Sequence, residues 1–230
     1  MLDRSSPGIR GAMLCRTRCI DDAVANALKR GLNTVVILGA GLDTRPYRLP
    51  GIEAKPVFEV DLPAVQAYKK SCLVRRFGAL PPHVRFVPMD FNVDRLDATL
   101  GRAGLAAQEP AIFIWEGVTQ YLQPEAVDSV LQTIAARPKG SELVFTYVLE
   151  EVVTGQIRPD RDEAFRKSAS RRPEPWYFGI APSRLEAFLS ERKLTLREDV
   201  GAEDHLARYV TPLGRELAVS EIERVARAGV

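Results

Sequence analysis

Cysteine is scarce in this sequence: Cys15, Cys19 and Cys72 are the three cysteines among 230 residues. An odd and sparse set does not make the disulfide framework of a small secreted protein. Cys15 and Cys19 lie four residues apart on an expected helix, but no histidine or second cysteine pair follows nearby to complete a tetrahedral zinc site. We therefore expect reduced thiols and no metal.

A charge excess and a long apolar run are also missing. Lysine plus arginine number 32 against 30 for aspartate plus glutamate, a net charge of +2, whereas nucleic-acid partners select basic surfaces. No stretch approaches the ~18 apolar residues that cross a bilayer. Near the start, Met13–Cys15 are flanked by Arg10, Arg16 and Arg18, which is unlike a signal peptide. We expect a cytoplasmic protein with no nucleic-acid and no membrane partner.

Apolar residues are plentiful, at 46% of the chain, which is enough for one domain over 1–230. Residues 1–31 are expected to form an N-terminal helical segment, because Ile20, Val24 and Leu28 recur on one face up to Gly31. β-branched runs then alternate with helical ones. The expected strands are 34–38, 56–60, 84–87, 111–115 and 142–147, with two weaker candidates at 194–199 and 217–222.

This alternation predicts the fold class. Connections too long for hairpins imply right-handed crossovers between parallel strands. We therefore expect an α/β fold with a doubly wound, mainly parallel seven-stranded sheet and helices on both faces.

Three further helices have inward and outward faces that can be read from the sequence. After Pro63 the expected inward side chains are Val65, Tyr68 and Cys72, and the outward ones are Lys69, Lys70, Arg75 and Arg76. After Pro124 the expected inward stripe is Val127, Val130, Leu131 and Ile134, and a third helix is expected at 183–191. Residues 148–182 are charged and longer than an ordinary connection, which indicates a lid or insertion with an apolar tip at Trp176–Phe178.

Glycines and acids follow the strands at the positions where such sheets bind ligands. Gly39 and Gly41 end the first strand, but Thr44 stands where the dinucleotide fingerprint requires a third glycine. Glu59 and Asp61 both lie about twenty residues beyond, where a carboxylate can accept ribose hydroxyls, and strand alternation points them the same way. Asp90 and Glu116 follow the next two strands, so these acids are expected to converge on one crevice.

Three segments together closely resemble the leucine carboxyl methyltransferase family, in particular its bacterial branch related to polyketide O-methyltransferases. The segments are 35–45 (VVILGAGLDTR), 58–63 (FEVDLP) and 114–122 (IWEGVTQYL), and the resemblance runs from about Arg16 to the end of the chain, including Glu174–Trp176 and Arg208–Tyr209. It implies a Rossmann-like class I methyltransferase fold with S-adenosyl-L-methionine as the methyl donor, and O-methylation of a carboxylate or hydroxyl on a small-molecule acceptor.

The resemblance also implies roles for individual residues. Arg16 would hold the methionine carboxylate of the donor, and Gly39 and Gly41 would shape the turn that binds it. Asp61 rather than Glu59 would take the ribose hydroxyls. The remaining implied contacts are Asp90 with Phe91 at the adenine and Glu116 near the methionine end. Family members usually carry a longer region before the arginine, whereas fifteen residues precede Arg16, so we expect the acceptor to be less covered.

Candidates for a general base are few. His205 follows the sixth strand candidate on the ligand side, and Tyr121 and Tyr147 could line the acceptor pocket, although buried tyrosines are more often structural. His83 precedes the third strand, at the opposite edge. Two alternatives remain open: an NAD-dependent oxidoreductase, and a non-catalytic module that binds S-adenosylmethionine. No feature of the sequence indicates an oligomeric state.

Overall fold

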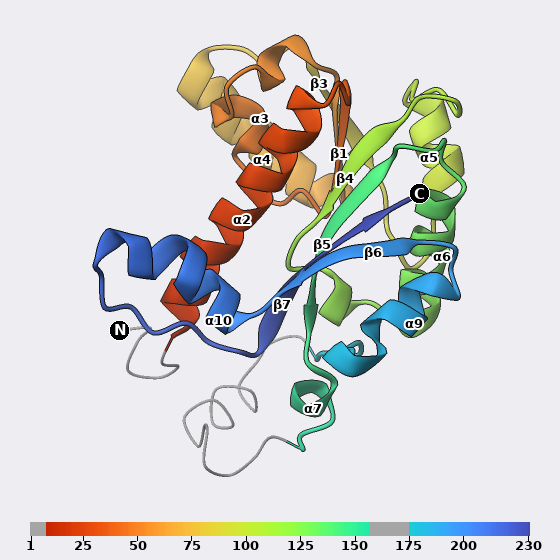
Figure 1. The fold of residues 1–230 in the computed structure, drawn as a ribbon. Helices are drawn as coiled ribbons and strands as arrows, with labels where there is room; N and C mark the ends of the chain where they lie inside the picture. The colour runs from red at the N-terminus through yellow and green to blue at the C-terminus, as the bar shows by residue number, and fades with distance from the viewer. Residues whose placement is uncertain (1–7, 157–174) are drawn as a thin grey trace.

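A computed structural model describes residues 8–156 and 175–230, and these form one seven-stranded sheet in the order β3-β2-β1-β4-β5-β7-β6 (Figure 1). The strands are β1 Thr34–Leu38, β2 Val57–Asp61, β3 Val84–Pro88, β4 Ala111–Trp115, β5 Glu142–Val148, β6 Thr195–Val200 and β7 Glu223–Gly229. β7 pairs antiparallel with β5 and β6, and the other pairings are parallel. The predicted fold class is therefore confirmed.

Helices cover both faces of the sheet (Figure 1). Those used below are α2 Ile9–Lys29, α3 Arg45–Arg48, α4 Pro63–Phe77, α5 Leu96–Arg102, α6 Pro124–Ala135, α7 Glu150–Val153, α9 Leu185–Ser190 and α10 Ala202–His205, with the short turns η2 Thr119–Tyr121, η3 Pro182–Arg184 and η4 Leu206–Val210. One apolar cluster joins α2 to one face of the sheet, and a second joins α5, α6 and α9 to the other. None of the described helices is long and apolar enough to span a membrane.

The central strands form because their residues suit burial on both faces. β1 and β4 are buried at every position and rich in β-branched or aromatic side chains, so they show no polar alternation. The predicted stripe of α6 is also confirmed, since Val127, Val130, Leu131 and Ile134 are its buried residues. α2 buries Ile20 and Val24 as expected.

The position of the seventh strand was predicted wrongly. Residues 217–220 have no regular structure, and the strand begins at Glu223. The pattern misled because this strand is short of large apolar residues. Its buried positions include Val225, Ala226 and Ala228, while Arg224 and Arg227 form ion pairs with β6.

The inward face of α4 was also predicted wrongly. The residues that it buries are Gln66, Lys69 and Leu73, whereas Tyr68 is 58% exposed. Helical periodicity places a lysine outward by default, but Lys69 has a carboxylate partner beneath it, on β2. The lid predicted at 148–182 lies partly outside the described residues and stays a prediction.

The strand order predicts a crevice at the carboxyl ends of the parallel strands, the end of the sheet called the ligand edge here. β1 pairs with β2 on one side and with β4 on the other, so the order of the strands reverses between β1 and β4, which are themselves parallel. Ligands in open α/β sheets bind outside the carboxyl ends of the strands at such a switch point. Because β7 is antiparallel and Glu223 is paired with Val148, the start of β7 lies at this same edge.

Candidate functional site

The turn after β1 is hydrogen-bonded to the end of β2. The N–H groups of Gly39 and Ala40 both donate to the carbonyl oxygen of Val60, at 2.8 and 3.0 Å. The N–H group of Gly41 donates to Oδ2 of Asp61 at 2.5 Å. All three backbone donors of the turn are therefore directed into the protein.

The two glycines of the turn are required for different reasons, although both have positive φ, 66° at Gly39 and 41° at Gly41. A Cβ on Gly39 would overlap the side chain of Val118. A Cβ on Gly41 would meet nothing closer than the Gly39 carbonyl oxygen at 3.9 Å. Gly41 therefore borders open space, while Gly39 allows close packing.

A cavity of about 530 Å³ opens over this turn. Its walls come from α2, from the β1 turn with α3, and from the end of β4. The lining residues are Met13, Arg16, Thr17, Ile37–Thr44, Arg45, Arg48, Glu116 and Gly117. The volume falls within the roughly 300–1,000 Å³ of small-molecule sites.

Charged side chains of both signs meet in the wall of this cavity. Nε of Arg16 donates to Oε1 of Glu116 at 2.7 Å, and its Nη1 donates to Oε2 of Glu223 at 2.5 Å. Nη1 of Arg45 donates to the other Glu116 oxygen at 2.6 Å and to Asp43 at 2.7 Å. Both oxygens of Glu116 are thus engaged by arginines from two different helices.

Comparison with known proteins identifies the family. The leucine carboxyl methyltransferase family model matches residues 2–135. The chain belongs to the leucine carboxyl methyltransferase family. A relative from Mycobacterium sp. strain KMS, named "Putative S-adenosyl-L-methionine-dependent methyltransferase", is 41% identical over 164 residues, covering 70% of this chain and 49% of the relative. A relative of the same name from Mycolicibacterium gilvum is 43% identical over 138 residues, covering 59% of this chain and 44% of the relative. The chain spans about half the length of the curated relatives it matches.

Solved structures share the fold. A DUF574 family protein from Streptomyces avermitilis superposes with a TM-score of 0.67 at 18% identity, covering 99% of this chain and 87% of the other. The magnesium protoporphyrin IX methyltransferase from Synechocystis, solved with bound SAH (S-adenosylhomocysteine), gives 0.58 at 11% identity, covering 96% and 85%. The fold is that of the Rossmann-like class I methyltransferases.

In this family member, the two candidate ribose acids on β2 have different surroundings. Glu59 is fully buried and accepts from Lys69 at 2.8 Å and from Tyr47 at 2.7 Å. Burial raises the pKa of Glu59, and the ammonium of Lys69 opposes that rise. Asp61 is only partly buried and touches the glycine turn. Asp61 is the less buried of the two acids but does not line the cavity itself, so its contact with the ribose stays a prediction.

The residues expected at the adenine lie away from the turn. Asp90 follows β3, and its carboxylate accepts the N–H of Asn92 at 2.9 Å. Phe91 packs partly buried against the cluster that contains α5. Neither residue lines the cavity, although both lie beyond β3 at the same edge of the sheet, and their role stays a prediction.

Sequence reasoning missed several residues of the charged network, among them Arg45, Asp21 and Glu223. Arg45 is 2% exposed. Although burial alone would lower its pKa, the carboxylates of Asp43 and Glu116 raise it above the ordinary value, so this guanidinium stays charged. Asp21 pairs with Arg45 at 2.8 Å from the buried side of α2. Asp21 had a usable signal, as a charge beside Ile20 and one turn before Val24 on the expected helix. Glu223 had none, because it lies 207 residues from Arg16.

The three candidates for a general base do not line this cavity. The hydroxyl of Tyr147 donates to Asp199 at 3.1 Å, and burial and that carboxylate raise its pKa. Tyr121 is 38% exposed and meets Trp176 edge to face. His205 is 1% exposed within α10, which packs against α2, and burial lowers its pKa to about 4.

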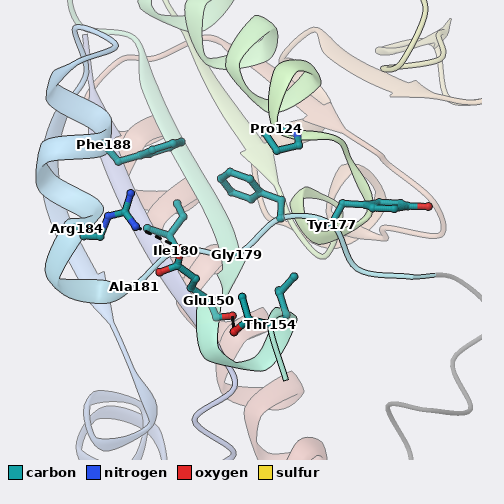
Figure 2. Close-up of a pocket in the computed structure, with 11 residues that line it drawn as sticks. Pro124, Glu150, Thr154, Tyr177, Gly179, Ile180, Ala181, Arg184 and Phe188 are labelled. Carbon is teal, nitrogen blue, oxygen red and sulfur yellow. Dashed lines mark hydrogen bonds and ion pairs between the residues drawn. The ribbon is translucent and has the colours of Figure 1, made fainter. Parts of the chain in front are cut away.

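A second cavity of about 350 Å³ lies beyond the carboxyl end of β5 (Figure 2). Its lining comes from Pro124 at the start of α6, from α7 and the following Thr154, from residues 177–181, from η3 and from α9. The ring centroids of Phe178 and Phe188 are 5.8 Å apart, and Arg184 pairs with Glu150 at 3.3 Å. This cavity shares no lining residue with the cavity over the glycine turn.

Proposed function

We propose that this chain is an S-adenosylmethionine-dependent methyltransferase that methylates an oxygen of a small-molecule acceptor. The observation that carries the proposal is the cavity over the Gly39–Gly41 turn. It combines open space beside Gly41 with ion-paired side chains of both signs. Family membership and the names of the relatives support it.

The residues around the cavity fit the donor. Its amino acid end carries a carboxylate and an ammonium, which suit the cluster of Arg16 and Glu116. Asp61 stands at the turn, where a carboxylate can accept ribose hydroxyls. The donor has no phosphate, and the N–H groups of Gly39, Ala40 and Gly41, which would face one, donate to β2 instead. When bound, this group supplies a methyl on a sulfonium, which is already a strong electrophile.

The chain's own task is then to position the acceptor oxygen and exclude water. A carboxylate acceptor requires no base, because it attacks as the anion. A hydroxyl acceptor must lose its proton. His205, Tyr121 and Tyr147 all lie outside the lining of the cavity, which favours a carboxylate acceptor. A cytoplasmic location belongs to the same proposal.

An NAD-dependent oxidoreductase is the main rival. Dinucleotide folds direct the N–H groups of the glycine turn and the following helix terminus at a pyrophosphate. Here the N–H groups of Gly39, Ala40 and Gly41 donate to β2, which disfavours a pyrophosphate at this turn.

Calorimetric titration with S-adenosylhomocysteine and, separately, with NAD tests the proposal. We expect binding of the former alone, followed by methyl transfer in a screen of small carboxylic acids and phenols. NAD binding without S-adenosylhomocysteine binding contradicts the proposal. S-adenosylhomocysteine binding without turnover over the whole screen supports the non-catalytic module instead.

A further inference from the structure

A buried ion pair lies directly beneath the glycine turn. Lys69 of α4 is 4% exposed, and its Nζ lies 2.8 Å from Oε1 of Glu59, which is fully buried. The same Nζ donates to the carbonyl oxygen of Ala40 at 3.3 Å. One ammonium therefore bridges β2 and the turn.

Fold stability does not explain a charge at this place. Burying two opposite charges removes both from water, and replacing such a pair with apolar residues of similar volume is often neutral or stabilising. The neighbouring Lys70 shows that α4 can turn a lysine toward its surface, where its ammonium lies 4.9 Å from the ring centroid of Phe86. The contact with the turn is what distinguishes Lys69.

The hydrogen bond from Lys69 to the Ala40 carbonyl holds one peptide group of the turn. The plane between Ala40 and Gly41 carries the Ala40 carbonyl and the Gly41 N–H. Lys69 donates to the carbonyl at 3.3 Å, beside the Asp43 N–H, which donates to the same oxygen at 2.7 Å, and Asp61 accepts from the N–H of Gly41. Both polar groups of the plane are thus held by charged side chains, immediately before the glycine whose φ is 41° and whose open face borders the cavity.

The anchor of Lys69 is itself fixed. Oε1 of Glu59 also accepts from the hydroxyl of Tyr47 at 2.7 Å, and Nε2 of Gln66 donates to the Glu59 backbone carbonyl at 2.7 Å. Tyr47 of α3 and Gln66 of α4 therefore both hold Glu59 in place. A rigid anchor allows Lys69 to transmit a fixed geometry to the turn.

We propose that Lys69 is a positioning residue of the cavity, which clamps the Ala40–Gly41 peptide together with Asp61 and so holds the surface against which the methyl donor packs. The identity of the donor rests on the proposed function. The clamp itself does not, because it concerns the turn in the free protein.

The test compares the double variant Glu59→Met/Lys69→Met with the wild type. Native-state hydrogen exchange is measured at the Gly41 and Asp43 amides, both donors within the turn, relative to β4 amides of the same molecule. We expect this ratio to rise about tenfold, because loss of the clamp opens the turn locally without opening the core. Affinity for S-adenosylhomocysteine should fall by about tenfold.

Two matched variants separate positioning from general loosening. Lys70→Met is the same change one residue further along α4 and should leave both readouts unchanged. Tyr47→Phe removes one Glu59 contact without touching Ala40, and should lower the melting temperature while raising the exchange ratio much less than the double variant does. If the double variant fails to fold, Lys69→Gln is measured instead, since its amide ends one bond short of the ammonium.

Wild-type exchange and affinity in a folded double variant overturn the inference. So does an equal rise of the exchange ratio in Tyr47→Phe. A wild type that does not bind S-adenosylhomocysteine contradicts the proposed function, and the exchange ratio in the free protein then decides the role of Lys69 alone.

Discussion

At the scale of single residues, a side chain at Gly41 should affect ligand binding much more than folding, because Gly41 borders open space. Replacing Gly41 with valine should abolish S-adenosylhomocysteine binding, because the new side chain occupies cavity space that no protein atom fills. The strain of a positive φ should cost about 1–2 kcal/mol of stability. Calorimetry and thermal melting measure the two effects.

Gly78→Val is the matched control for this change. Gly78 caps α4 with a φ of 80° and also has nothing near its Cβ position, but it does not line the cavity. It should show similar strain and bind normally. Normal binding by a folded Gly41→Val variant means that the donor lies elsewhere.

The two acids of β2 should respond oppositely to neutral substitution. Asp61→Asn should weaken S-adenosylhomocysteine binding, since charge-assisted bonds are worth about 1.5–3 kcal/mol, with little change in melting temperature. Glu59→Gln should lower the melting temperature more and the affinity less, because it leaves the buried Lys69 without a counter-charge. The reverse ranking in titration and melting experiments assigns the ribose to Glu59.

Arg16 is the third residue whose role can be measured. Arg16→Ala should reduce S-adenosylhomocysteine affinity by about ten- to hundredfold, the loss of one charge-assisted contact. Its melting temperature should fall as well, since Glu223 loses its partner while Glu116 retains Arg45. Arg18, whose side chain is 66% exposed, supplies the control, and Arg18→Ala should change neither. Equal affinities in both variants reject a donor contact by Arg16.

At the scale of elements, the packing of α6 depends on its stripe of buried apolar residues, Val127, Val130, Leu131 and Ile134. Leu131 is fully buried, whereas Gln132 is exposed. Leu131→Ala should lower the free energy of unfolding by about 2–5 kcal/mol, since it leaves a cavity in the core. Gln132→Ala should change it by less than about 0.5 kcal/mol. Urea denaturation measures both, and equal values mean that α6 does not pack as described.

Elements differ in how well local pattern predicts them. α6 was predicted residue by residue because its one apolar stripe has no competing explanation. The inner face of α4 and the start of β7 were predicted wrongly, because each element carries a basic residue that pairs with an acid on a neighbouring strand. Lys69 of α4 pairs with Glu59 of β2, and Arg224 of β7 pairs with Asp199 of β6. Periodicity counts apolar side chains and assigns every charge to solvent, so it fails where the fold supplies a counter-charge.

At the scale of the whole molecule, His205 should make folding sensitive to acid. Its pKa is about 4 in the folded protein, chiefly through burial, with Arg208 and Arg224 also lowering it and Asp204 opposing. The unfolded value is near 6.5, so between these pH values the unfolded chain binds more protons and stability rises with pH. The loss on acidification should begin near pH 6.5 and reach roughly 3 kcal/mol by pH 4.

Chemical denaturation at several pH values checks this dependence. A His205→Leu variant, which carries no proton in either state, should lose less stability than the wild type between pH 6.5 and 4. His83→Gln serves as the histidine control, because the His83 ring is only part-buried, with Nε2 2.9 Å from the Pro46 carbonyl oxygen. Parallel curves for wild type and His205→Leu exclude His205 as the source.

The sequence by itself determined the alternation of strands and helices, the first five strands to within a residue or two, and the segments that mark the family. These depend on residues close together in the chain, where side-chain period and glycine placement act directly on the backbone. The tertiary structure decided which charges meet. Arg16 with Glu223, Arg45 with Glu116 and Lys69 with Glu59 join residues from different elements, and such a pairing is favourable only once folding has removed both partners from water and brought them within bonding distance.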